Sequence, residues 1–145
     1  MSVTLIQSGV LRRGSLRGTA TVALVCGALL VAPAGASANA DVCQPDSLRS
    51  YVCIKIFGSD RYVDHFQAVR ARWGSICNYR GRIRVRGGGR TWNFRSRRHL
   101  GCSYGRAWFN FYVRRRFPNN STACTFFYEG GVLQGAVPCA RIYRS

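Results

Sequence analysis

Arginines recur at every second position in one short stretch of the chain. The four are Arg80, Arg82, Arg84 and Arg86. In an extended strand, alternate side chains point to the same face, and same-face neighbours lie about 6.6 Å apart. Guanidinium groups at this pitch can bind successive phosphates or carboxylates, each through two parallel hydrogen bonds. The spacing therefore predicts a binding surface for an anionic polymer.

The surrounding segment, 80–98, contains eight arginines and no acidic residue. Arg90 and Trp92 follow a run of three glycines, and we include both in the predicted polyanion-binding site. Trp108 and Tyr112 would share one face of another strand. Arginines mixed with aromatic rings are typical of grooves that bind single-stranded nucleic acid. The alternative is a solvated charged face that reflects composition alone, since the chain has 21 arginines and one lysine.

A ribonuclease would need a general acid and a general base on either side of the scissile phosphate. The candidates are His65, His99 and Glu129. Two histidines, or one histidine and a glutamate, can carry out these proton transfers. Spacing along the chain does not bring them together, and no G-x-S-x-G motif of a serine hydrolase is present. We therefore expect a non-catalytic protein, with a small secreted ribonuclease as the enzymatic alternative.

Six cysteines are expected to form three disulfides. We predict sequential pairing, which closes three short loops: Cys43 with Cys53, Cys77 with Cys102, and Cys124 with Cys139. Six cysteines allow many other pairings. No C-x-x-C spacing is present, which argues against a zinc site, and we expect no metal and no cofactor.

Residues 1–40 have the pattern of a secretory signal peptide. Three arginines precede an uncharged run over residues 19–32, which is followed by two A-x-A sites. A run of this length suits a signal peptide, whereas a membrane-spanning helix needs about 18 residues or more. Cleavage after Ala38 and cleavage after Ala40 both remain open. The sequence thus predicts a leader, 1–40, and a single domain, 41–145.

Removal of this leader leaves a strongly basic domain with an even number of cysteines. The formal charge falls from +17 to +14 on 105 residues, because three arginines and no acids are lost, and Cys26 leaves with them. Disulfides persist in oxidising compartments. A charge of this size attracts polyanions at low salt. We therefore expect a secreted, extracellular monomer with no transmembrane segment after processing.

The mature chain resembles a series of strands separated by turns. Apolar and β-branched stretches cover 51–57, 107–113, 122–128 and 141–143. Residues 82–86 and 91–95 both alternate, on either side of three glycines, which predicts a hairpin. A second hairpin turn is expected at 129–131. This spacing predicts a mainly β fold, a small disulfide-bonded antiparallel sandwich or barrel.

Residues 59–74 fit two different structures. Four apolar residues from Tyr62 to Trp73 recur at i, i+4, i+7 and i+11, which is the spacing of a short helix near 60–73. The turn sequence at 58–60 directly follows a strand and favours a hairpin instead. We expect a strand, because the rest of the chain has β character.

Four motifs of the mature chain are Y-V-C-I-K-I-F-G-S at 51–59, W-F-N-F at 108–111, F-P-N at 117–119 and P-C-A-R-I at 138–142. Their arrangement resembles small exported, cysteine-containing proteins of actinobacteria, a group that is uncharacterised. The resemblance implies secretion and a β-rich, disulfide-bonded fold. It assigns no active-site residue.

These features together predict a secreted cationic protein that binds anionic extracellular or envelope polymers without catalysis. An antimicrobial role would follow from the same attraction to bacterial envelopes. Nucleic acid is a less favoured ligand than other anionic polymers. A protease-inhibitor module is a further alternative, although the sequence shows no Pro- and Cys-framed reactive loop.

Overall fold

A computed structural model describes residues 39–144, which form eight strands and no helix. The strands are β1 (Ala40–Ser47), β2 (Ser50–Ser59), β3 (Tyr62–Gly87), β4 (Arg90–Arg95), β5 (His99–Arg116), β6 (Ser121–Glu129), β7 (Val132–Leu133) and β8 (Cys139–Ile142). The predicted leader lies outside the described residues, apart from Asn39 and Ala40. No helix in the described part of the chain is long and apolar enough to span a membrane.

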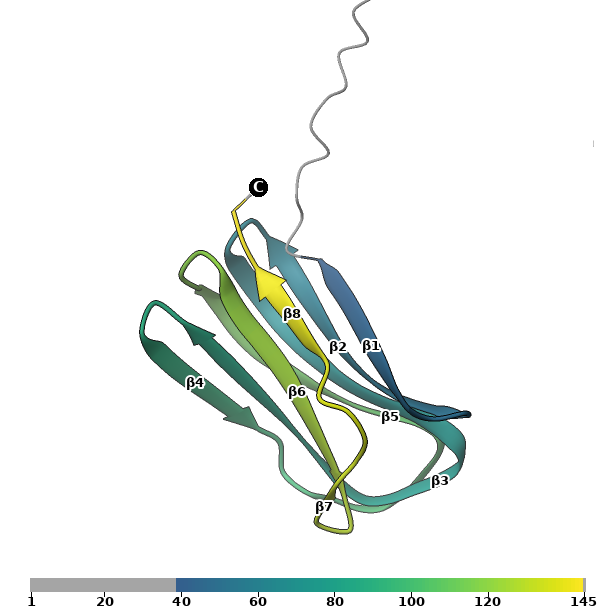
Figure 1. Ribbon diagram of the computed structural model, residues 1–145. Coiled ribbons are helices and arrows are strands. Elements are labelled where there is room, and N and C mark those ends of the chain that lie inside the picture. The colour runs from purple at the N-terminus through teal and green to yellow at the C-terminus, as the bar shows by residue number, and fades with distance from the viewer. Residues whose placement is uncertain (1–38, 145) are drawn as a thin grey trace, which may run out of the picture. The chain divides into compact units, whose positions relative to one another are not determined.

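The long strand β3 organises the sheet, because its two halves pair with different neighbours (Figure 1). Its first half pairs with β2 on one side and β5 on the other, and β1 adds to the outside of β2. Its second half pairs with β4 and β6, and β8 adds to the outside of β6. All pairings are antiparallel. The first layer consists of β1, β2, β5 and the first half of β3. The second layer consists of β4, β6, β8 and the second half of β3.

β3 passes from one layer to the other through a bulge at Gly74. The ladder with β5 is interrupted between Ala71 and Ser75, where three residues of β3 lie opposite the single residue Gly105. Gly74 and Gly105 have φ values of 100° and 73°, which glycine adopts without the strain that a side chain would cause. Such a bulge bends a strand and redirects its side chains. The neighbouring Trp73 consequently points into solvent.

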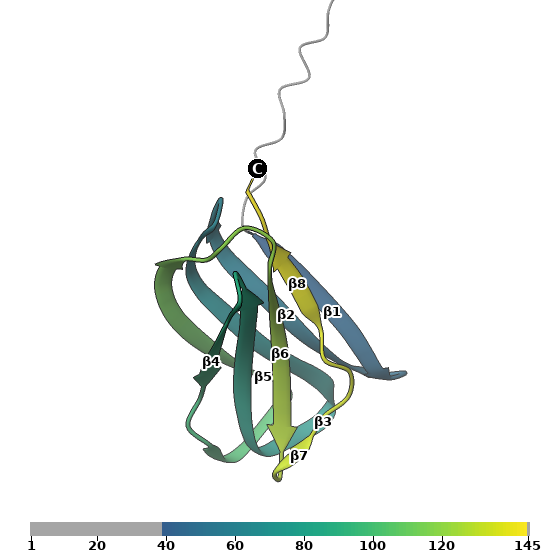
Figure 2. The ribbon, with the colours of Figure 1, turned by 60° about the vertical axis from the view of Figure 1, so that its left-hand side comes forward.

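The core fills the space between the two layers. Phe66 and Ala68 point inward from the first half of β3, and Ile83 and Val85 point inward from the second half. They pack with apolar residues of β2, β5, β6 and β8 and with Phe117. Burying each large apolar side chain contributes roughly 1.5–3 kcal/mol. At the edge of the core β1 and β8 lie side by side (Figure 2).

Three disulfides join residues that lie directly opposite one another on neighbouring strands. They are Cys43–Cys53 between β1 and β2, Cys77–Cys102 between β3 and β5, and Cys124–Cys139 between β6 and β8. The Cα atoms of the three pairs are 4.0, 4.0 and 4.1 Å apart. This is the sequential pairing predicted from the sequence, and each bond links an outer or bent strand to its neighbour.

The predicted fold class is confirmed: the protein is mainly β, antiparallel and sandwich-like, and the sheet does not close into a barrel. Both expected hairpins are present, as β3–β4 and β6–β7. Residues 62–74 lie within β3, so the strand interpretation is correct and the helical alternative is wrong. The helical spacing arose because both faces of β3 carry apolar side chains. Phe66 is buried in the core, whereas Val69 is buried on the outer face beside Trp108.

Candidate polyanion-binding face

The four alternating arginines lie on the outer face of the second layer. Between them, Gly81, Ile83 and Val85 point into the core and are buried. We call Arg80, Arg82, Arg84 and Arg86 the arginine row. The strand alternation expected from the sequence thus places all four side chains on one solvent-facing surface, with the hydrophobic core directly behind them.

Two aromatic rings of the neighbouring strand β6 support the row. The guanidinium carbon of Arg80 lies 4.8 Å from the centre of the Tyr128 ring. Those of Arg82 and Arg84 lie 5.6 and 5.0 Å from the centre of the Phe126 ring. Cation–π attraction at these distances favours a fixed position over the sheet. Ordering the side chains before a ligand arrives lowers the entropy cost of binding.

A pocket of about 170 Å³ opens at one end of the row. It is lined by Arg80, Gly81, Arg82, Arg95, Ser96 and Tyr128. Arg95 joins the row because it lies opposite Arg82 in the β3–β4 ladder. The Ser96 hydroxyl accepts a hydrogen bond of 2.8 Å from the Gly81 amide, which holds this end of β4 against β3. Three guanidinium groups around one pocket suit a phosphate, sulfate or carboxylate group.

The acidic residues all lie elsewhere, each against a basic partner. The pairs are Asp41 with Lys55, Asp46 with Arg70, Asp60 with Arg116, Asp64 with His65 and Arg114, and Glu129 with Arg70 and Arg72. Within residues 39–144, neither the arginine row nor Arg95 forms an ion pair with a carboxylate. The outer face of the second layer therefore keeps its full positive charge.

Arg90 and Trp92, which we included in the predicted site, lie apart from the row. Trp92 is opposite Val85 in the β3–β4 ladder and therefore faces the core side of the sheet. Its ring packs edge-on against Phe117, with 5.3 Å between the ring centres. Arg90 lies two residues earlier on β4 and so on the same side of that strand. Neither side chain shares the outer face with the row.

The aromatic partners of the row, Phe126 and Tyr128, were missed in the sequence analysis. Both faces of β6 carry apolar residues, so alternation alone does not show which set points outward. Arg141 was missed for a similar reason. It lies opposite Thr122, and Thr122 lies opposite Arg86, so Arg141 shares the outer face of the second layer. The position of these side chains on the outer face depends on cross-strand register, which the sequence does not specify.

The two candidate catalytic histidines are separated and have other partners. The His65 ring stacks on Phe57, with 4.3 Å between ring centres and an angle of 8° between the planes. Its Nδ1 atom lies 2.8 Å from an Asp64 carboxylate oxygen. The exposed His99 instead stacks against Tyr79, at 4.6 Å. Among the described residues, neither histidine contacts the other or Glu129.

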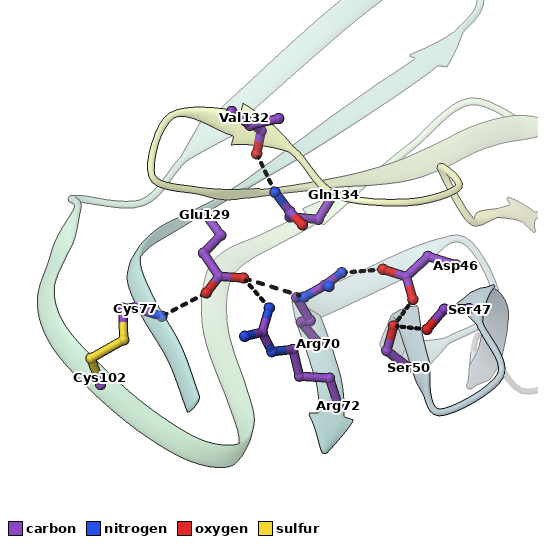
Figure 3. Close-up of polar contacts among 10 residues, drawn as sticks. All are labelled: Asp46, Ser47, Ser50, Arg70, Arg72, Cys77, Cys102, Glu129, Val132 and Gln134. Atoms are coloured by element: carbon purple, nitrogen blue, oxygen red, sulfur yellow. Dashed lines mark hydrogen bonds and ion pairs between the residues drawn. A yellow bond between two sulfur atoms is a disulfide. The ribbon is translucent and has the colours of Figure 1, made fainter. Parts of the chain in front are cut away.

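Glu129, the third catalytic candidate, belongs to a mostly buried ionic cluster (Figure 3). Its carboxylate accepts hydrogen bonds from the Cys77 amide, at 2.9 Å, and from Arg72, at 3.2 Å. It also lies 3.9 Å from Arg70, whose other end pairs with Asp46 at 2.5 Å. The cluster connects the end of β1, the middle of β3 and the end of β6. These contacts give Glu129 a structural role. The structure does not bring His65, His99 and Glu129 together in one site.

In the described part of the chain, one cluster of three side chains is of the kind that can bind metal ions. It consists of Asp41, Cys43 and Cys53, whose ligand atoms lie within 4.8 Å of one another. The two sulfur atoms are bonded to each other in a disulfide. A metal ion needs the thiolate form of cysteine. This group therefore stabilises the pairing of β1 and β2 rather than forming a metal centre.

No family model, no curated protein and no solved structure matches this chain. The fold and the site together define a small disulfide-bonded, mainly β protein with aligned arginines on the outer face of its second layer.

Proposed function

We propose that the protein binds anionic polymers, without catalysis, through the arginine row and Arg95. We call these five residues the arginine face. One observation carries the proposal: five guanidinium groups gather on one outer surface, and none has a carboxylate partner within residues 39–144. Like charges at this spacing repel one another, and an anionic ligand removes that repulsion.

The shape of the face favours a linear ligand. The row runs along β3 with a pitch of about 6.6 Å, from the pocket beside Arg95 to the turn that follows Arg86. A chain with a phosphate or carboxylate on each repeating unit can contact several guanidinium groups at once. Each contact releases counterions, so the binding depends steeply on salt.

We place this function outside the cell. Three disulfides are compatible with an oxidising compartment. The signal-peptide pattern of residues 1–40 and the resemblance to exported actinobacterial proteins support the same location. Anionic polymers of cell walls and envelopes are the ligands available there, and an antimicrobial effect would follow from tight binding to them.

Charge reversal on the row tests the proposal. We expect the double variant Arg82→Glu, Arg84→Glu to bind fluorescently labelled polyphosphate about tenfold or more weakly at low salt. The matched control is Arg97→Glu, Arg98→Glu, which makes the same change in net charge in the exposed β4–β5 loop. The control should retain most of the affinity. Equal losses in the two variants would show that net charge, rather than the arginine face, determines binding.

RNA used as the polyanion in the same assay tests the enzymatic alternative. A non-catalytic protein leaves the RNA at full length on a denaturing gel. Shortened RNA would favour the ribonuclease, provided that a His65→Ala, His99→Ala variant no longer shortens it.

A further inference from the structure

Large apolar side chains gather around the bulge of β3, away from the arginine face. Leu48 in the β1–β2 turn, Trp73 on the bulge and Tyr104 on β5 are 104%, 78% and 74% exposed. We call these three residues the apolar tip. The Trp73 amide donates a hydrogen bond of 3.3 Å to the Arg49 carbonyl, which ties the turn to the bulge. An open hollow of about 370 Å³ lies beside Trp73 and Tyr104, and Arg49, Tyr51 and Gly74 also line it.

The exposure of Trp73 results from the backbone. The bulge places three residues of β3 opposite Gly105. The left-handed conformation of Gly74 changes the direction of the strand after Trp73, so the Trp73 side chain is not covered. A single exposed apolar residue needs no explanation, but a cluster around one hollow marks an interaction site.

Two basic residues without carboxylate partners within residues 39–144 lie near the apolar tip. Arg49 lines the hollow, and Arg106 lies opposite Ala71 in the adjacent ladder. Within residues 39–144 neither forms an ion pair. Arg72 also lines the hollow, but its guanidinium donates to Glu129. The site thus has an apolar centre and a cationic margin.

This combination fits the headgroup region of an anionic bilayer. Tryptophan and tyrosine favour that region because their rings are apolar and their N–H and O–H groups remain hydrated. Arginine extends to lipid phosphates while its methylene groups stay in the apolar layer. Three side chains of this size cover only a few hundred Å², less than the roughly 800 Å² per partner of a stable protein interface. The area and the charge therefore favour a lipid surface over a protein partner.

We propose that the apolar tip inserts into the interface of membranes that contain anionic lipids. Trp73 and Tyr104 enter the headgroup layer, and Arg49 and Arg106 contact lipid phosphates. The arginine face does not take part in this insertion, so the inference goes beyond the polymer-binding function and does not depend on it.

Sedimentation with vesicles tests the inference. The vesicles contain phosphatidylglycerol and phosphatidylcholine, or phosphatidylcholine alone. We expect the wild-type protein to bind the anionic vesicles and Trp73→Ala to bind them about tenfold more weakly, as burial of a large apolar side chain predicts. The matched control Trp108→Ala removes an exposed tryptophan of the first layer and should change the affinity less than twofold. Tyr104→Ser is a second variant at the tip, and mass spectrometry of the three disulfides verifies folding.

A second readout separates insertion from electrostatic adsorption. Brominated lipids should quench the tryptophan fluorescence of the wild-type protein, and Trp73→Phe should remove most of that quenching. Absence of wild-type binding, or binding that Trp73→Ala and Tyr104→Ser leave unchanged, would overturn the inference. Binding lost only in Arg82→Glu, Arg84→Glu would also overturn it and would leave the polymer-binding proposal intact.

Discussion

The guanidinium carbon of Arg84 lies 5.0 Å from the centre of the Phe126 ring, and that of Arg82 lies 5.6 Å from the same ring. One aromatic side chain of β6 therefore holds two neighbouring cations of β3. The cross-strand register creates this arrangement, because Phe126 lies opposite Arg82 and Cys124 lies opposite Arg84. Contacts with aromatic rings therefore partly offset the repulsion between adjacent arginines of the row.

Replacement of Phe126 should weaken polymer binding without removing any charge. An exposed cation–π contact contributes about 0.5–1 kcal/mol, so Phe126→Leu should raise the Kd for polyphosphate about two- to fivefold. The control Tyr143→Leu changes a half-exposed ring that has no cation–π contact among residues 39–144. Fluorescence anisotropy at low salt measures both. An unchanged Kd for Phe126→Leu would mean that the ring does not order the row.

Loss of the buried Asp46 carboxylate should destabilise the fold. The side chains of Arg70 and Asp46 are only 4% and 8% exposed, and Ser50 donates a further hydrogen bond to Asp46. The Asp46→Asn change leaves the buried Arg70 guanidinium with only the more distant Glu129 carboxylate, at 3.9 Å, so it should lower the free energy of unfolding by about 3 kcal/mol.

The more exposed ion pair between Asp60 and Arg116 provides the matched control for this change. Asparagine tolerates the positive φ of 53° at position 60. Asp60→Asn should therefore cost about 0–1 kcal/mol. Urea denaturation monitored by fluorescence compares the two variants. Equal losses would contradict the structural role assigned to the buried cluster.

The three disulfides should differ in their contribution to stability. They close loops with sequence separations of 10, 15 and 25 residues. In the chain-entropy treatment, their removal costs about 2.7, 3.0 and 3.5 kcal/mol respectively. Double cysteine-to-alanine variants, compared by urea denaturation, should follow that order. A larger loss for Cys43–Cys53 than for Cys77–Cys102 would show that native contacts, rather than loop length, determine the contribution.

Local patterns predicted much of this fold. Alternation placed the arginine row on one face, because Ile83 and Val85 between the arginines are apolar. The glycine turns at 87–89 and 130–131 marked two hairpins, and sequential cysteine pairing suited antiparallel neighbours. All of these features depend on residues close together in the chain.

Features that depend on distant contacts were missed. The pairing of Arg82 with Arg95 and Phe126 follows from the register of three strands, which no local pattern specifies. Trp92 faces the core because it lies opposite Val85. The sequence suggested separate elements on either side of Gly74 rather than the single long strand β3. A bulge at Gly74 lets one continuous strand pass from the first layer to the second.

The salt dependence of polyanion binding tests the central claim most directly. Each phosphate contact on single-stranded DNA contributes about 0.7 to the slope of log K against log salt. Replacing Arg80, Arg82, Arg84 and Arg86 with glutamine should therefore reduce the slope for an oligodeoxynucleotide by about 2 to 3. The control variant replaces Arg97, Arg98, Arg106 and Arg144, four exposed arginines off the arginine face, and should change the slope by less than about 1. A control variant that loses as much slope as the row variant would contradict the assignment of binding to the arginine face.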